Sequence, residues 1–138
     1  MEKKITAIVQ ARTDSNRLKS KVLKKISGKE TILILLDRLS QAKSLDKIIV
    51  AIPNSQKNKK LKKVLLKNNY EVFEGSHTNV LKRYYDCGLK YSLKHIMRVT
   101  GDCPLLDPKL VDKLANKYKR GNYDYVYLLI YLLVIVLY

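Results

Sequence analysis

Three cationic side chains occupy one polar loop near the start of the chain. Arg12, Arg17 and Lys21 follow the short apolar run Ile5–Gln10, which is typical of a buried strand. Planar guanidinium groups can each hold phosphate oxygens through two hydrogen bonds, whereas a lysine supplies a compact charge. Backbone N–H groups of such a loop add further donors. This pattern favours a site for an anionic ligand such as a nucleoside triphosphate.

A carboxylate follows another predicted strand. The run His95–Thr100 ends at Gly101, which permits a close backbone approach, and Asp102 comes next. A carboxylate at that edge of a sheet suits Mg²⁺, which takes one or two carboxylates together with phosphate oxygens and water. We interpret Asp102 as a metal ligand and not merely as a turn former. Asp107, in contrast, is interpreted as a helix cap because Pro108 follows it.

The elements that must position these side chains alternate between strand and helix. Strands are predicted over 5–10, 47–52, 70–73 and 95–100, and helices over 31–42, 56–68, 79–91 and from 107 onward. This alternation predicts an α/β fold with a mostly parallel sheet that is covered on both faces. Such sheets bind ligands at the carboxyl ends of their strands, where the polar loops of this chain lie.

Composition limits the class of protein. With 138 residues, 46% hydrophobic and 29% charged, the chain is predicted to be a single globular domain. The net charge of +16 has two interpretations, a solvated lysine-rich surface or a polyanion-binding patch. The lysines around Leu61, Val64 and Leu65 flank apolar residues at helical spacing, which favours the solvated surface.

The two cysteines and the N-terminal residues exclude further classes of protein. Cys87 and Cys103 have neither paired spacing nor a histidine in a ligand pattern, so a zinc site or a disulfide framework is not expected. The first apolar run is too short for the core of a signal peptide. We therefore expect a cytoplasmic protein.

The last stretch of the chain differs from the rest. From Tyr125 to Tyr138 it has no charged residue, Gly or Pro, and it is shorter than the roughly 17–25 residues of a membrane-spanning helix. We interpret residues 1–126 as the nucleotide-binding domain and residues 127–138 as an aberrant apolar tail, produced by a reading-frame change or truncation. A genuine buried terminal strand and a membrane-associating tail are the alternatives.

A third polar segment follows the strand predicted over 70–73. It contains Ser76 and His77 and leads into a helix that begins near Asn79 and carries Arg83. Asn is a favoured residue at a helix N-terminus, so the helix is expected to be capped there. His77 is interpreted as an exposed loop residue and not as a catalytic base.

Together the three segments resemble the cytidylyltransferase family of acidic-sugar activation, which includes acylneuraminate and CMP-KDO synthetase-like enzymes and a spore coat polysaccharide branch. The family pattern Ala-Arg-x-x-Ser-x-Arg-Leu-Pro-x-Lys is matched at Ala11, Arg12, Ser15, Arg17, Leu18 and Lys21. Lys19 stands where the family usually has Pro, and Ser20 where Gly is common. The later segments are similar to Phe-x-Gly-Ser-x-x-Asp-Val-Leu-x-Arg-Tyr, with Asn79 in place of Asp, and to Gly-Asp-x-Pro-Leu, with Asp102 at the metal-binding position.

The resemblance implies a three-layer Rossmann-like nucleotide-diphospho-sugar transferase fold whose C-terminal part is missing here. It implies transfer of CMP from CTP to an acidic sugar with release of pyrophosphate, for surface polysaccharide biosynthesis. The implied roles fall into three groups: Arg12, Arg17 and Lys21 at the triphosphate, Asp102 at Mg²⁺, and Ala11, Ser15, Ser76 and Arg83 in the nucleotide pocket.

The expected partners are CTP and an acidic sugar, with no nucleic acid and no membrane. A homodimer is expected if the family interface survives in this chain. Two alternatives stay open. One is a truncated, non-catalytic remnant that at most binds nucleotide, and the other is a basic nucleic-acid-binding domain, for which the ten tyrosines would supply stacking surfaces.

Overall fold

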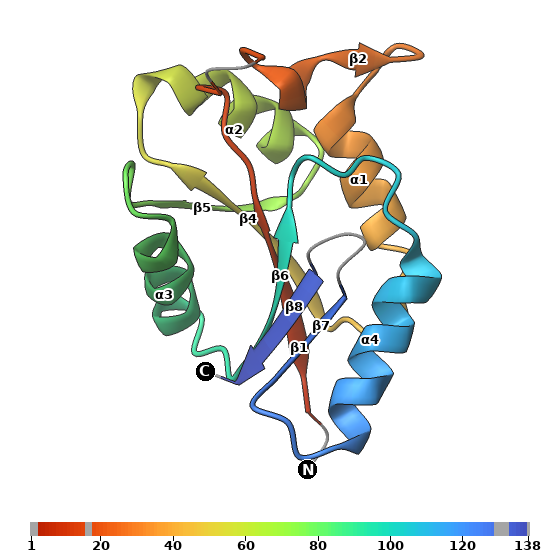
Figure 1. Ribbon diagram of the computed structural model, residues 1–138. Helices are drawn as coiled ribbons and strands as arrows, with labels where there is room; N and C mark the ends of the chain where they lie inside the picture. The colour runs from red at the N-terminus through yellow and green to blue at the C-terminus, as the bar shows by residue number, and fades with distance from the viewer. Residues whose placement is uncertain (1–2, 16–17, 129–132, 138) are drawn as a thin grey trace.

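A six-stranded sheet forms the centre of the molecule, for which a computed structural model describes residues 3–15, 18–128 and 133–137 (Figure 1). The strands are β1 (Ile5–Gln10), β4 (Lys47–Pro53), β5 (Glu71–Gly75), β6 (His95–Thr100), β7 (Tyr125–Leu128) and β8 (Leu133–Leu137). Their order is β5-β4-β1-β6-β8-β7. The first four strands of this order are parallel, whereas β8 and β7 are antiparallel to their neighbours. The predicted α/β class with a mostly parallel sheet is therefore confirmed.

Helices cover both faces of the sheet. They are α1 (Thr31–Leu39), α2 (Lys59–Lys67), α3 (Val80–Lys90) and α4 (Pro108–Arg120). Alternation along β4 separates two apolar clusters, because Val50 and Ile52 join one and Ile49 and Ala51 join the other. The first cluster contains the buried residues of α1, α2 and α4, and the second contains those of α3. The result is the three-layer arrangement visible in Figure 1.

The register of the central strands brings two loops together. Gln10, the last residue of β1, is aligned with Ala51 of β4 on one side and with Thr100 of β6 on the other. The chain leaves β1 and β6 at the same level, so the segments that follow them are neighbours. The backbone N–H of Gly101 donates to the carbonyl of Gln10 at 2.8 Å, which joins the two loops directly.

Two predicted helix caps are confirmed. The side chain of Asn79 accepts a hydrogen bond from the backbone N–H of Lys82 at 2.9 Å, and α3 begins at the next residue. Asp107 accepts from the N–H of Lys109 at 2.9 Å, with Pro108 in the first turn of α4. Both helices therefore begin directly after the loops that follow β5 and β6.

Several boundaries differ from the predictions. The helix predicted over 31–42 ends at Leu39, and its apolar residues Ile32, Leu35, Leu36 and Leu39 are fully buried. The helix predicted over 56–68 begins as a 3₁₀ turn, η2 (Gln56–Asn58), before α2. A two-stranded hairpin, β2 (Lys25–Ile26) and β3 (Lys29–Glu30), was not predicted. Its strands are too short to show periodicity, and its turn residues Ser27 and Gly28 both have positive φ.

The described residues of the C-terminal run, 125–128 and 133–137, continue the sheet. β8 pairs with β6, and β7 pairs with β8 at the sheet edge. Val126 of β7 packs into the apolar cluster that contains the buried face of α4. Within the described ranges, no helix has the length and apolar character needed to cross a membrane. The domain boundary between 126 and 127 stays a prediction.

Candidate functional site

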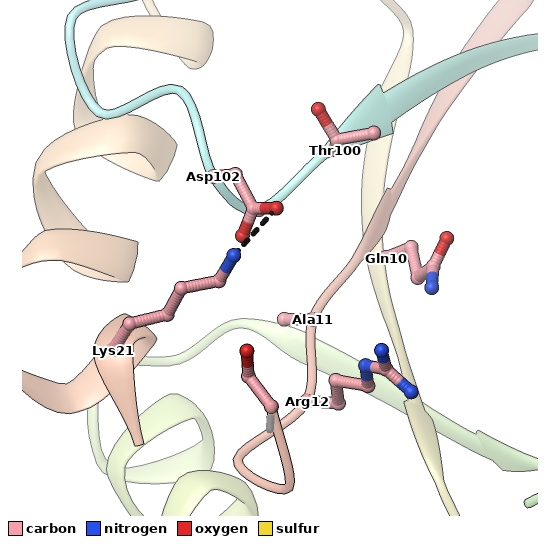
Figure 2. A pocket seen from close by; sticks show the side chains of 8 residues that line it. Gln10, Ala11, Arg12, Lys21, Thr100 and Asp102 are labelled. Carbon is pink, nitrogen blue, oxygen red and sulfur yellow. Dashed lines mark ion pairs between the residues drawn. The ribbon is translucent and has the colours of Figure 1, made fainter. Parts of the chain in front are cut away.

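A pocket of about 290 Å³ lies at the carboxyl ends of β1 and β6. Its lining consists of Gln10, Ala11, Arg12, Ser15, Lys21, Thr100, Gly101 and Asp102 (Figure 2). Six of these residues were selected from the sequence, Gly101 for a close backbone approach and the other five as site residues, and the fold brings them together from segments far apart in the chain. Gln10 and Thr100 were not predicted. Their place as the last residues of β1 and β6 was the available signal, because strand ends at this edge face the loops that bind ligands.

Lys21 and Asp102 form an ion pair inside this pocket. Nζ of Lys21 lies 2.8 Å from Oδ2 of Asp102, and the two side chains are 30% and 52% exposed (Figure 2). Ion pairs this accessible to water contribute only about 0–1 kcal/mol. The pair is therefore weak enough for a charged ligand to replace either partner.

Lys21 is held at its backbone while its side chain reaches into the pocket. The residue begins a 3₁₀ turn, η1 (Lys21–Leu23), whose Val22 is buried in the core. Its carbonyl accepts a hydrogen bond from the hydroxyl of Thr31 at 2.9 Å, at the start of α1. Ser20, just before it, adopts the left-handed conformation with φ of 52°. This turn directs the Lys21 side chain toward the loop that follows β6.

Gly101 sets the position of Asp102. A Cβ added at Gly101 would lie 2.8 Å from the carbonyl oxygen of Gln10 and 3.2 Å from Cβ of Ala11. Any side chain here would force the loop after β6 away from the end of β1. Glycine therefore allows the close approach that places Asp102 opposite Lys21.

Arg12 faces a different part of the pocket. In Figure 2 its guanidinium group and the Lys21–Asp102 pair lie on opposite sides of Ala11. Its side chain is 53% exposed, and its Nε lies 4.0 Å from Oδ1 of Asp14. The guanidinium group therefore remains accessible to an anionic ligand. The other arginine predicted for this loop, Arg17, lies outside the described residues.

The third predicted segment lies beside this pocket and not in its lining. Arg83 is 1% exposed, and its Nε and Nη2 donate to the carbonyl of Ser76 at 2.9 and 2.8 Å. The hydroxyl of Ser76 accepts from the N–H of Asn79 at 3.1 Å. Burial lowers the pKa of the Arg83 guanidinium, and the nearby Asp14 carboxylate opposes that shift. Contact of Ser76 and Arg83 with a nucleotide stays a prediction.

Two buried polar atoms near Arg12 have no hydrogen-bond partner within the described part of the chain. They are Oδ1 of Asp14 and Nη1 of Arg83. Oδ2 of Asp14 lies 3.9 Å from Nε2 of His77, which belongs to the loop after β5. A buried acceptor and a buried donor without hydrogen-bond partners are unfavourable unless a ligand or water pairs with them.

The donor chemistry of the pocket is compatible with a divalent cation that is bound together with phosphate. Across the described ranges, no cluster of three or more His, Cys, Asp or Glu side chains could hold a metal ion. Mg²⁺ does not require such a cluster, because one carboxylate with phosphate oxygens and water is a sufficient set. Asp102 offers that carboxylate, half-exposed in the pocket.

The chain matches one protein family and several curated proteins. A family model described as cytidylyltransferase matches residues 6–133. An uncharacterized protein of Methanocaldococcus jannaschii is 42% identical over 123 residues, which are 89% of this chain and 51% of that protein. The spore coat polysaccharide biosynthesis protein SpsF of Bacillus subtilis is 32% identical over 129 residues, which are 91% of this chain and 54% of that protein.

Solved structures show the same fold. A cytidylyltransferase from Leptospira borgpetersenii has a TM-score of 0.87 and 26% identity, covering 97% of this chain and 60% of that one. A CMP:2-keto-3-deoxy-manno-octonic acid synthetase complexed with CTP has a TM-score of 0.75 and 21% identity, covering 83% and 46% of the two chains. The chain thus spans about half the length of the curated relatives it matches.

Proposed function

Because the chain belongs to the cytidylyltransferase family, we propose that its pocket binds CTP and transfers CMP to an acidic sugar with release of pyrophosphate. The observation that carries this proposal is the joint presence of Arg12, Lys21 and Asp102 in one pocket at the carboxyl ends of β1 and β6. Two cations match a triphosphate, and one carboxylate matches the metal that accompanies it.

The proposed reaction is an in-line displacement at the α-phosphorus. A bond forms between a sugar hydroxyl oxygen and that phosphorus, the bond to the bridging oxygen of pyrophosphate breaks, and the hydroxyl proton is released to solvent. Such transfer depends mainly on positioning and on neutralising charge. Arg12 and Lys21 would hold the phosphates and offset the negative charge that develops on the leaving pyrophosphate.

Asp102 would hold Mg²⁺, which supplies charge neutralisation at the phosphates when it is bound. Nζ of Lys21 lies 2.8 Å from that carboxylate in a water-accessible pair, so its ammonium group would be able to contact the triphosphate. In this arrangement the ion pair keeps both groups in the pocket before the ligand arrives.

The unpartnered atoms beside Arg12 support a role in holding the rest of the nucleotide. Oδ1 of Asp14 can accept a hydrogen bond and Nη1 of Arg83 can donate one, and both are buried. A cytosine ring presents an amino group and neighbouring acceptors, so its polar edge could satisfy both atoms. The proposed nucleotide pocket thus comprises Ala11, Ser15, Ser76 and Arg83, with Asp14 as an additional member.

The acidic sugar and the role in surface polysaccharide biosynthesis are inferred from relatives. One relative is the 3-deoxy-manno-octulosonate cytidylyltransferase of Chlorobium phaeobacteroides, 30% identical over 126 residues, and another is SpsF. We further propose a cytoplasmic location and no nucleic-acid or membrane partner. A homodimer is proposed for the case in which the family interface survives in this chain.

The test is pyrophosphate release from CTP with Mg²⁺ and a panel of acidic sugars. Release should require both a sugar and Asp102, so Asp102→Asn should reduce it at least 100-fold. Asp107→Asn is the matched control, because Asp107 caps α4 and does not line the pocket. CTP binding without release from any sugar would support the nucleotide site and contradict the transfer reaction.

A further inference from the structure

Thr13 fixes the loop that carries the pocket residues Arg12 and Ser15. Its backbone N–H donates to Oδ1 of Asn58 at 3.0 Å, and its hydroxyl donates to the carbonyl of Lys57 at 2.8 Å. The hydroxyl also lies 3.2 Å from Oδ1 of Asn58. Both Thr13 and Asn58 are buried. This contact joins the loop after β1 to the turn η2, which precedes α2.

Asn58 directs its side chain to this loop and not to its own helix. It occupies the N-terminal cap position of α2, where Asn commonly accepts from the helix backbone, yet its side chain makes no such bond. Its Nδ2 donates instead to the hydroxyl of Ser55 at 2.8 Å. That bond leaves Oδ1 to accept from Thr13, so the amide group is held in one orientation.

The contact extends to the second cation of the pocket. The carbonyl of Thr13 accepts from the N–H of Ser20 at 2.8 Å, and Lys21 is the next residue. Asn58 is thus linked through Thr13 to both arms of the loop, with Arg12 on one side and Lys21 on the other. Asn58 itself does not line the pocket.

We propose that Asn58 is a positioning residue for the triphosphate site, holding Arg12 and Lys21 at the spacing that a triphosphate requires. This inference rests on the proposed function for its ligand, but its structural basis is independent of it. Asn58 acts through Thr13 and does not contact the ligand. Removing its acceptor leaves the buried N–H of Thr13 without a partner, which favours a rearranged loop.

Two measurements test the proposal on Asn58→Ala, Asn58→Asp and the control Asn68→Ala. Asn68 lies at the other end of α2, where its side chain donates to the carbonyl of Val64. The first measurement is amide hydrogen exchange at Thr13 and Ser20, and the second is calorimetric titration with CTP and Mg²⁺. Asn58→Ala should raise the amide exchange rates of Thr13 and Ser20 at least tenfold, and it should raise the Kd for CTP at least tenfold. Asn58→Asp keeps an acceptor for Thr13 but adds a buried charge, so only its exchange rates are compared and they should stay within threefold of wild type. Asn68→Ala should match wild type in both measurements.

The outcomes separate a positioning role from a structural one. Unchanged exchange at Thr13 and Ser20 in folded Asn58→Ala would overturn the proposal, as would a lower melting temperature with an unchanged CTP Kd. If Asn58→Ala does not fold, Thr13→Val replaces it, and Thr13→Ser should restore the affinity that Thr13→Val loses. If wild-type protein does not bind CTP, the proposed function fails, while the exchange data still decide whether Asn58 orders this loop.

Discussion

The segments that follow β1 and β5 both leave the same edge of the sheet, but the arginine in the loop after β1 and the arginine in α3, which follows β5, have different roles. Arg12 is half-exposed and lines the pocket. Arg83, in the first turns of α3, is buried and donates two hydrogen bonds to the carbonyl of Ser76 in the loop before that helix. Both arginines follow a strand and lie near Asp14, so proximity in the fold does not separate them.

The difference shows that the direction of an arginine's donors decides its main role. The donors of Arg12 remain available to a ligand, whereas most of those of Arg83 stabilise a loop. Among the residues that the structure describes, Nη1 of Arg83 is buried and finds no hydrogen-bond partner. Arg83 can therefore combine a structural role with a single contact to a ligand. Substitutions that separate stability from nucleotide affinity test this comparison.

The largest change in stability is expected for Arg83→Ala. It removes the hydrogen bonds to Ser76 and leaves a cavity below the loop, so the free energy of unfolding should fall by about 3 kcal/mol. Urea denaturation followed by circular dichroism measures this loss. A change below about 1 kcal/mol would mean that the buried arginine does not hold the loop after β5.

Arg12→Ala should have the opposite profile. A charged hydrogen bond to a phosphate contributes about 1.5–3 kcal/mol, so CTP affinity should fall by about tenfold to 100-fold. The free energy of unfolding should change by less than about 0.5 kcal/mol, because Arg12 is largely exposed. Calorimetry and denaturation of the same preparation measure both quantities. Loss of stability without loss of affinity would contradict the comparison.

Lys21→Met tests whether the second cation of the loop after β1 contributes to CTP binding. The substitution keeps most of the aliphatic stem and removes the charge that pairs with Asp102. CTP affinity should fall about tenfold, while the unliganded protein should lose less than about 1 kcal/mol because the pair is exposed to water. The loss of affinity should shrink as NaCl is raised, since salt screens exposed charges. An affinity that matches wild type at low salt would remove Lys21 from the ligand site.

The smallest effect is expected at Ser20. This residue has φ of 52°, a conformation that costs L-residues roughly 1–2 kcal/mol but is open to glycine. After the entropy of glycine in the unfolded chain is subtracted, Ser20→Gly should stabilise the protein by about 0.5 kcal/mol. Ser40→Gly is the control. Because Ser40 has φ of −68°, which does not favour glycine, this substitution should destabilise the protein instead. Thermal denaturation should show a higher melting temperature for Ser20→Gly and a lower one for Ser40→Gly.

Much of the fold could be predicted from the sequence because strands and helix caps follow from local residue patterns. The strands Ile5–Gln10 and His95–Thr100 have the predicted bounds, and the caps at Asn79 and Asp107 act as predicted. The hairpin β2–β3 and the 3₁₀ turn η2 were not predicted, because neither is long enough to show an apolar period.

The candidate site was predicted in its residue types but not in its geometry. The Lys21–Asp102 pair joins residues from separate loops, and the pattern of neither loop shows that they meet. Asn58 lies in a lysine-rich stretch that was interpreted as a solvated surface, and its hydrogen bonds to Thr13 depend on the packing of α2. Such contacts arise only when the tertiary structure is formed.

The most direct test of the central claim is calorimetric titration of CTP into wild-type protein and Asp102→Asn, each with Mg²⁺ and with EDTA. With Mg²⁺, wild-type protein should bind CTP and Asp102→Asn should bind at least tenfold more weakly. With EDTA the order should reverse, because removing the carboxylate frees Lys21 and removes a negative charge beside the triphosphate. No binding by folded wild-type protein, or equal binding by both proteins in both buffers, would contradict a nucleotide site between the loops after β1 and β6.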